Sequence, residues 1–514
     1  MIKMGHHSSL SNTMKINFKK SIFYCCVASA AAMLMSTASF AQYQVNSRSY
    51  YVNAFGNDKN AGTKTAPFKS IGKVNSTRLH AGDTVYFKSG QVFNGSLLIV
   101  RSTGTLSRPV VITSYGSSKA TIDAKDSVGI EMYNGAYIKL QHLTLVGSGR
   151  KTGNTKDGVA INYSNHIVAE DIDVSGFQKS GLRIYASKSI VAKMIFAHDN
   201  GSAGITVESP YPKRESSNIK ILNCRAVNNP GDPTNLTNHS GNGIVVGNCK
   251  NVLIDHCMAT NNGWDMPRIG NGPVGIWAYE AENVVIQYCL SYNNKTSKGG
   301  ADGGGYDLDG GVTNSVVQYC FSYGNQGSGY CIFQYWGASA WHDNIFRYNI
   351  SENDGTVSDS QAGLYIWNSS DDEKQFYNCD VYSNIIYNDK VAAISFSDKS
   401  ESKGIRFYNN IFVGKDSLIK GIDKVGDVKY LGNDWWSIDS GFNIKDIQDL
   451  HTWAVKTGKE QLNGKVIGLN INPDFITPGN TTIPSVSQLP KAFANYYIKN
   501  ARIRKKFALL QLKN

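Results

Sequence analysis

Three absences narrow the function of this chain before any motif is considered. The excess positive charge comes almost entirely from residues 1–42 and 501–514. The chain from residue 43 to residue 500 has 43 basic and 40 acidic residues, so it lacks the positive charge expected of a nucleic-acid-binding protein. No run of 18 apolar residues follows residue 42, and we therefore expect no transmembrane segment there. No CxxC pair occurs among the nine cysteines, which argues against a zinc site.

Residues 1–42 combine an N-terminal extension with the three parts of a secretory signal. Lysines precede an apolar stretch over residues 22–34, and small residues at 38–41 offer a cleavage site before Gln42. We therefore expect a bacterial protein that is secreted to the periplasm or the medium, where disulfides are permitted. The mature protein is expected to be a monomer.

Short segments with one rhythm recur along residues 126–412. Each begins with glycine, or once with alanine, and continues with apolar side chains at alternate positions, which is typical of a β-strand. Self-similarity at intervals of roughly 20–50 residues is typical of a solenoid, in which the strands of successive coils stack. The segments begin at Gly158, Gly181, Gly204, Gly243, Gly275, Gly305, Gly329, Gly363 and Ala393.

Four cysteines occupy the same place in consecutive repeats. Cys224, Cys257, Cys289 and Cys320 are separated by 33, 32 and 31 residues. This spacing predicts a column of buried thiols, because free cysteine packs as a small apolar residue. Whether a neighbouring pair is oxidised stays open at this point.

The extent of the repeat pattern divides the chain into three sections after the signal. Residues 43–125 are expected to form an entry module that caps the solenoid, residues 126–412 about ten regular coils, and residues 413–514 a C-terminal cap with a basic tail. Long loops interrupt three consecutive coils, and such loops are the expected place for binding functions. They comprise residues 228–240, 263–273 and 295–304.

Two parts of the chain resemble known proteins. Residues 50–122, with Pro67–Ile71, Ala81–Phe87 and Val111–Gly116, are similar to the start of right-handed parallel β-helix proteins of the pectin-lyase-like superfamily. Two stretches within residues 272–311 resemble bacterial β-helix repeat proteins. The resemblance implies an all-β fold, a single-stranded right-handed parallel β-helix. That superfamily includes polysaccharide lyases, glycoside hydrolases, epimerases and non-catalytic glycan binders, so function depends on the site.

Strand alternation turns every second side chain outward, so the stacked repeats share one long outer face. Asp307 and Asp309 lie on this face between aromatic side chains, which bind the C–H faces of sugars through apolar contact. The alternative is that these aromatic side chains pack under loops. The residues expected to bind substrate are Trp277, Tyr279, Tyr365, Trp367, Phe333, Gln334, Arg183, Tyr185 and Glu208.

The acidic residues on this face allow three interpretations. Asp307 and Asp309 are two positions apart on one strand, about 6–7 Å apart. With Glu280 of the preceding repeat, they suit the acid and base of an inverting glycosidase. Alternatively, they only cap turns. His239, which ends the loop over residues 228–240, is a candidate general base, although a hydrogen-bonded loop histidine would look the same.

The third interpretation comes from the resemblance. In many pectate lyases of this fold a cation neutralises the substrate carboxylate, and a lysine or arginine removes the proton α to it for β-elimination. Asp302, Asp307 and Asp309 would then hold Ca²⁺ through their oxygens. The acids have no outward lysine beside them, so the base would come from a loop. The loop candidates are Lys298, Arg268, Lys213 and Arg214.

Together these features predict a secreted enzyme that cleaves glycosidic bonds in an extracellular, uronate-containing polysaccharide. The resemblance favours a lyase that acts by cation-assisted β-elimination. A glycoside hydrolase, a non-catalytic glycan-binding or matrix protein, and a polyuronate epimerase are the alternatives.

Overall fold

The computed structural model describes residues 46–370, 372–397, 402–424 and 426–506. The chain divides at Asn46, and the unit described below is Ser47–Asn514. The predicted secretory signal over residues 14–42 lies outside the described residues, as does the end of the basic tail. Within the described part, no helix combines the length and apolar character needed to cross a membrane.

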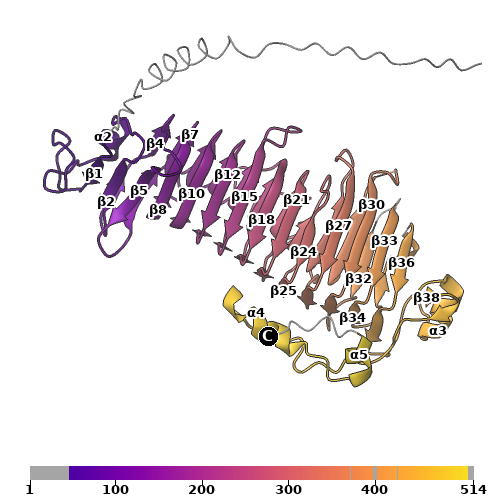
Figure 1. Ribbon diagram of the computed structural model, residues 1–514. Coiled ribbons are helices and arrows are strands. Elements are labelled where there is room, and N and C mark those ends of the chain that lie inside the picture. The colour runs from indigo at the N-terminus through magenta and orange to yellow at the C-terminus, as the bar shows by residue number, and fades with distance from the viewer. Residues whose placement is uncertain (1–45, 371, 398–401, 425, 507–514) are drawn as a thin grey trace, which may run out of the picture. The chain divides into compact units, whose positions relative to one another are not determined.

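One parallel sheet of 12 strands carries the repeats that the sequence predicts (Figure 1). Each strand pairs with the corresponding strand of the next coil, and ten of the twelve, β7 to β32, lie within residues 126–412, where about ten coils are expected. The strands are β4 (Leu97–Val100), β7 (Ile130–Tyr133), β9 (Val159–Asn162), β11 (Ser180–Tyr185), β14 (Ala203–Glu208), β17 (Asn242–Gly247), β20 (Val274–Tyr279), β23 (Gly304–Leu308), β26 (Tyr330–Gln334), β29 (Leu364–Asn368), β32 (Ile394–Ser397) and β35 (Ile419–Lys420).

A second sheet of 25 strands supplies the other two sides of each coil. One series is β1 (Ser49–Val52), β2 (Thr84–Lys88), β5 (Val110–Tyr115), β8 (Ala136–Gly147), β10 (Asn165–Ser175), β12 (Lys188–Lys193), β15 (Ser216–Leu222), β18 (Cys249–Asp255), β21 (Glu282–Gln287), β24 (Val316–Gln318), β27 (Trp341–Arg347), β30 (Phe376–Tyr382), β33 (Lys403–Tyr408) and β36 (Val428–Leu431). The other is β3 (Val92–Asn94), β6 (Ala120–Lys125), β13 (Phe196–His198), β16 (Arg225–Val227), β19 (Met258–Thr260), β22 (Leu290–Tyr292), β25 (Phe321–Tyr323), β28 (Ile350–Glu352), β31 (Ile385–Tyr387), β34 (Ile411–Gly414) and β37 (Asp434–Ser437). The predicted all-β parallel β-helix is therefore confirmed.

The register of the 12-stranded sheet follows the predicted alternation. Trp277 of β20 pairs with Asp307 of β23, and Asp307 pairs with Cys331 of β26. Their neighbours Ile276 and Ala278 are fully buried between the sheets. Side chains at equivalent outward positions therefore form straight rows that run from coil to coil.

Polar side chains at the coil corners are also stacked inside the protein. Buried asparagines pass amide hydrogen bonds from one coil to the next, for example from Asn229 to Asn262 (2.9 Å) and from Asn262 to Asn294 (2.8 Å). The row ends where Asn325 donates to the buried carboxylate of Asp354 at 2.8 Å. Because each amide both donates and accepts, these corners stay buried without unpaired polar groups.

The seven described cysteines are all buried and free, which confirms the predicted column of thiols. The backbone N–H of Cys224 donates to Sγ of Cys257 at 3.4 Å, and that of Cys257 donates to Sγ of Cys289 at 3.3 Å. Burial raises the pKa of the Cys257 thiol well above its usual value, so the thiol is protonated and unreactive.

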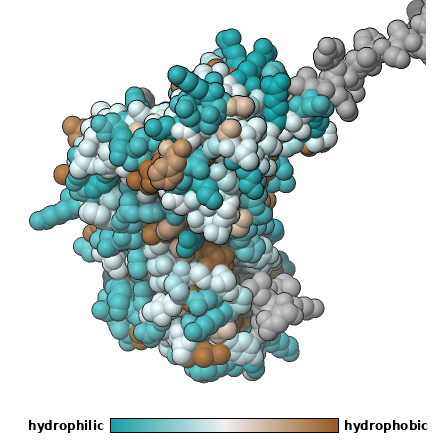
Figure 2. Space-filling model, turned by 90° about the vertical axis from the view of Figure 1, so that its left-hand side faces the viewer, coloured by the Kyte–Doolittle hydropathy of each residue, from teal (hydrophilic) through white to brown (hydrophobic). Residues whose placement is uncertain are grey.

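The N-terminal end of the described coils is covered. Helix α2 (Ile71–Asn75) buries Ile71 and Val74 against the first coils. The face at the left of Figure 1, turned to the viewer in Figure 2, is mostly hydrophilic, with apolar side chains in small separate groups. Strand pairing is continuous across residues 125 and 412, the expected boundaries between the coils and the caps, and extends to β37.

The C-terminal segment returns along the coils. A helix begins at Leu450, where the Asp449 carboxylate caps its first turn. Apolar side chains from residues 475–503 pack on the outer side of β19, β22, β25, β28, β31 and β34. In Figure 1 this part of the chain lies below β25 and β34. The remaining elements are η1 (Ile422–Lys424), α3 (Leu450–Thr457), β38 (Gln461–Leu462), β39 (Lys465–Val466), η2 (Val486–Gln488), α4 (Leu489–Asn495) and α5 (Ala501–Lys506).

Candidate functional site

An open pocket of about 360 Å³ lies on the outer face of the 12-stranded sheet. Strands β11, β14 and β17 form its floor, and the loop over residues 228–240 forms one wall. The titratable side chains that line it are Asp157, Lys179, Arg183, Glu208, His239 and Tyr279. Four of them, Arg183, Glu208, His239 and Tyr279, belong to the residues selected from the sequence.

Strand register brings Arg183 and Glu208 together. Tyr185 of β11 pairs with Glu208 of β14, so Glu208 lies one coil beyond Tyr185 in the same outward row. Nε of Arg183 lies 3.7 Å from Oε2 of Glu208. The pocket therefore holds a guanidinium and a carboxylate side by side, both partly exposed to solvent.

Tyr279 completes this group from β20. Its hydroxyl donates a hydrogen bond to the Glu208 carboxylate, and burial raises the pKa of the Tyr279 phenol above its ordinary value. The ring lies over Gly247, where an added Cβ would come within 2.1 Å of the Tyr279 Cζ atom. Glycine at position 247 thus leaves the space that the Tyr279 ring fills.

Asp157 lies at the edge of the pocket just before β9. The backbone N–H of Ser180 donates to its Oδ1 at 2.9 Å. Burial raises the pKa of Asp157 to about 6, although the Arg183 and Lys179 charges act in the opposite direction. Near neutral pH this carboxyl can therefore exchange a proton with a bound molecule.

His239 is held in one tautomer by its neighbours. Oδ1 of Asn242 accepts from the Trp277 indole N–H at 3.0 Å, so the Asn242 amide nitrogen faces Nδ1 of His239, also at 3.0 Å. Because an amide nitrogen only donates, Nδ1 accepts and the ring proton resides on Nε2. Burial, with a smaller effect of Arg268, lowers the pKa of His239 to about 4, so the ring is neutral at pH 7.

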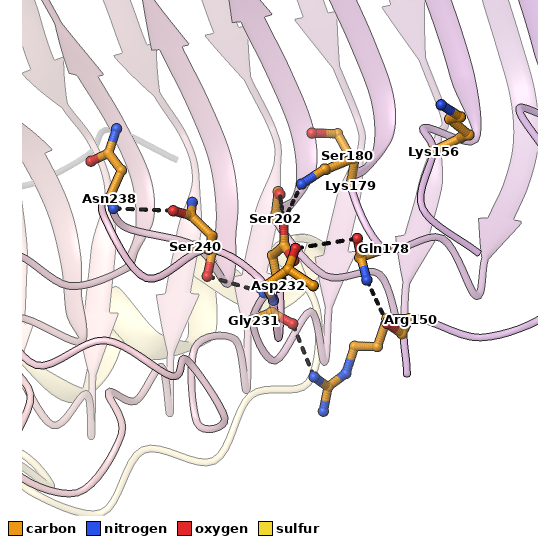
Figure 3. Close-up of polar contacts among 12 residues, drawn as sticks. Arg150, Lys156, Gln178, Lys179, Ser180, Ser202, Gly231, Asp232, Asn238 and Ser240 are labelled. Atoms are coloured by element: carbon orange, nitrogen blue, oxygen red, sulfur yellow. Dashed lines mark hydrogen bonds and ion pairs between the residues drawn. The ribbon is translucent and has the colours of Figure 1, made fainter. Parts of the chain in front are cut away.

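Lys179 is positioned by a carboxylate beneath the pocket (Figure 3). Its Nζ lies 2.5 Å from Oδ2 of the fully buried Asp232. Oδ1 of Asp232 accepts from the backbone N–H of Thr234 at 2.9 Å, and the Asp232 N–H donates to Ser240 Oγ at 3.0 Å. One buried carboxylate therefore ties the inserted loop to the cation that lines the pocket.

The predicted pair Asp307 and Asp309, with Glu280, does not form an open acid–base site. Asp307 is 1% exposed and Glu280 is 4% exposed. Ser339 donates a backbone hydrogen bond to Glu280 at 2.8 Å, and Arg214 lies 3.7 Å from the same carboxylate. Burial raises the pKa of Asp309 to about 7 and that of Asp307 well above its usual range. Residues from other loops therefore cover Glu280, whereas Asp309 is partly buried.

Backbone groups engage two of the three predicted calcium ligands, and calcium binding stays a prediction. Asp302 accepts from the Gly272 N–H at 2.6 Å, and Asp309 accepts from the Gly310 N–H at 2.7 Å. Oδ1 of Asp307 is buried without a hydrogen-bond partner. Across residues 46–506, excluding the gaps, no three acidic, histidine or cysteine side chains are arranged so that they could hold a metal ion.

Three of the six predicted sugar-binding aromatics are buried, in line with the alternative that the sequence left open. Trp277 is 3% exposed, Phe333 4% and Tyr365 8%. They form two small apolar clusters on the outer face, with Tyr279 and Trp367 at the partly exposed edges. Gln334 is also buried, and its amide holds the backbone of Gly311 and Ser339.

Among the remaining predictions, Lys298 and Arg268 lie on loops outside the pocket lining, and Tyr185 and Glu208 remain on the outer face.

Asp157, Lys179 and Asp232 were not selected from the sequence. Strict alternation would turn Gly181 outward, yet an added Cβ there would meet the interior Ala197 Cβ at 3.0 Å. The chain therefore bends at this glycine, and the residue before it also faces the pocket.

Comparison with known proteins gives a family but no near relative. Residues 50–353 match the family model described as Pel9A-like, right handed beta helix region. No curated protein sequence matches the chain.

Several solved structures are similar in fold. One is the GH136 lacto-N-biosidase from Eubacterium ramulus, at 15% identity and TM-score 0.40, covering 74% of this chain and 66% of that one. Another is pectate lyase Pel9A, at 16% identity and TM-score 0.38, covering 86% and 94%. A third is the alginate lyase from Paenibacillus sp. str. FPU-7, at 14% identity and TM-score 0.38, covering 70% and 98%.

This chain spans just under two thirds of the lacto-N-biosidase structure, and identities this low concern the fold alone. The family model, by contrast, covers more than half of the chain and coincides with the coils that build the pocket. The chain belongs to the Pel9A-like right-handed β-helix family.

Proposed function

We propose that this protein is an enzyme that cleaves glycosidic bonds of a uronate-containing polysaccharide by β-elimination in the pocket over β11, β14 and β17. The observation that carries the proposal is the convergence of Lys179 and Arg183 with Glu208 and Tyr279 in one open pocket. The family, named after Pel9A, is consistent with lyase chemistry. With the export predicted from residues 14–42, the substrate is an extracellular polymer.

The chemistry assigns one task to each group. The cations Lys179 and Arg183 bind the uronate carboxylate, which makes the proton on the adjacent carbon more acidic. The Glu208 carboxylate accepts that proton, the bond from the β carbon to the glycosidic oxygen breaks, and a double bond forms. The Tyr279 hydroxyl gives its proton to the departing oxygen. His239 donates from Nε2 to substrate oxygens.

A product assay tests the proposal directly. The purified protein is incubated with polygalacturonate, alginate and neutral polysaccharides, with and without chelator. We expect ultraviolet absorbance from an unsaturated product, in proportion to new reducing ends, on at least one uronate polymer. Activity confined to neutral polymers, or binding of every polymer without product, would contradict the proposal.

Asp157 favours hydrolysis as a second candidate. A carboxyl with its pKa raised to about 6 suits a general acid, and Glu208 in the same pocket suits the base that activates water. Hydrolysis produces reducing ends without ultraviolet absorbance, so the same assay separates the two reactions.

The pH profile provides a further prediction for Asp157. If Asp157 is the general acid, kcat falls as the pH rises through about 6, because the protonated carboxyl is the active form. Asp157→Asn then lowers kcat by about a hundredfold or more. In the β-elimination that we propose, Asp157→Asn keeps kcat within about threefold and leaves the shape of the pH profile unchanged. Asp173→Asn, on the other sheet, is the control for nonspecific effects.

A further inference from the structure

We propose that Tyr133, Tyr163 and Tyr185 form a glycan-binding platform beside the pocket. The platform lies on the coils that precede the pocket in the chain, and it holds sugar rings of the polymer beside the reacting bond. This inference rests on the proposed function, because it takes the pocket as the place of cleavage. It assigns a ligand to residues outside the pocket lining and predicts that the enzyme prefers long chains to short ones.

Two of the three rings are well exposed to solvent, and the third, Tyr185, has the Arg183 guanidinium over one face. Tyr133 is 39% exposed and Tyr163 is 44% exposed, and Tyr185 is partly exposed. Tyr133 and Tyr163 meet edge to face at 5.4 Å and 63°, and Tyr163 and Tyr185 do so at 5.7 Å and 84°. In such an arrangement each ring covers only part of its neighbour, so aromatic faces remain open.

A second column of tyrosines is built differently. Tyr288, Tyr319 and Tyr348, which follow strands of the 25-stranded sheet, are stacked nearly parallel at 5.1 Å and 6°, and at 5.0 Å and 13°. Their faces cover one another, so this column contributes to coil stacking and has little aromatic face left for a sugar. The angle between neighbouring rings therefore distinguishes the tyrosines of the platform from tyrosines that only stabilise the stacking of coils.

The platform continues directly into the pocket. Tyr133 pairs with Asn162, Asn162 with Tyr185, and Tyr185 with Glu208, which places them in one straight outward row. With strands about 4.8 Å apart, the row extends about 14 Å from Glu208. A polymer that lies along this row reaches Glu208 without turning.

Arg183 links the two regions. Its guanidinium lies over the Tyr185 ring, 4.4 Å from the centroid, and also lines the pocket. On the neighbouring strand, Arg183 pairs with Ala160, whose side chain is a single methyl group. Pyranose rings bury their apolar C–H faces on aromatic rings, while their carboxylates pair with a guanidinium. A uronate polymer has both features, and it is the ligand that this surface fits.

Affinity electrophoresis in gels that contain polygalacturonate or alginate tests the platform. Tyr163→Ala is compared with Tyr319→Ala, its matched control, because both residues have positive φ, 50° and 54°. We expect Tyr163→Ala to weaken binding of the polymer about five- to tenfold and Tyr319→Ala to leave it unchanged. Tyr163→Phe, which keeps the ring face, is expected to bind like the unmodified protein.

A short uronate disaccharide extends the test. It fills the pocket only, so Tyr163→Ala is expected to leave its affinity unchanged, as measured by calorimetry. Equal polymer binding by Tyr163→Ala and Tyr319→Ala would overturn the platform even if cleavage occurs. Tyrosine-dependent binding without any product would support the platform and contradict the proposed reaction. If the unmodified protein binds neither uronate polymer, both proposals are wrong.

Discussion

Glu208→Gln is expected to lower kcat on the uronate polymer by about a hundred- to ten-thousandfold, which is the usual contribution of a general base. Glutamine keeps the size of the side chain and can still accept the Tyr279 hydrogen bond, but it cannot take up a proton. Since the Arg183 pairing changes as well, KM is expected to rise only modestly. Initial rates from ultraviolet absorbance, together with a thermal unfolding curve, measure both effects.

Two control variants show where the reaction takes place. Glu131→Gln lies on the same outer face three coils away and is expected to keep full kcat. Asp309→Asn belongs to the buried acidic cluster that the sequence favoured, and it too is expected to keep kcat. If Asp309→Asn abolished cleavage and Glu208→Gln did not, the pocket would be the wrong site.

Asp232→Ala is expected to lower the free energy of unfolding by about 3 kcal/mol, because hydrogen bonds to a buried charge are lost together. The carboxylate of this fully buried residue accepts from Thr234 and holds Lys179. Without it the loop over residues 228–240 loses its attachment to the coil, and His239 moves with that loop. Urea denaturation followed by tryptophan fluorescence measures the change.

Asp232→Asn separates the two roles of this residue. The amide oxygen still accepts from Thr234, so most of the stability is retained, but the negative charge that holds the Lys179 ammonium is removed. We therefore expect Asp232→Asn to keep the unfolding midpoint near that of the unmodified protein and to raise KM for uronate polymers at least threefold. An unchanged KM would show that Lys179 takes no part in substrate binding.

The candidate site was only partly predictable. Arg183, Glu208 and Tyr279 follow from strand alternation, because stacked repeats place equivalent side chains in one row. His239 followed from its place in an inserted loop. Asp157 and Lys179 were missed, because they precede the glycine that begins each repeat and so lie outside the segments whose alternation predicts the outer face.

The acidic cluster shows the opposite error. Asp307 occupies the predicted row, between Trp277 and Cys331, yet it is 1% exposed. The prediction of its position on the strand was correct, and the prediction that it is accessible to solvent was wrong. Glu280 of the same group is covered by Arg214 and Ser339, which come from loops far from it in the sequence.

By itself the sequence determined the parallel β-helix, the register of its coils and the rows along its outer face, because these depend on a local alternation that repeats at each coil. Only the tertiary structure decided which part of that face is open. Exposure depends on how irregular loops from several coils pack over the strands, and no periodic pattern records those contacts. The pocket therefore lies beside Glu208, where the inserted loop leaves the strands uncovered, and not beside the more conspicuous aspartates.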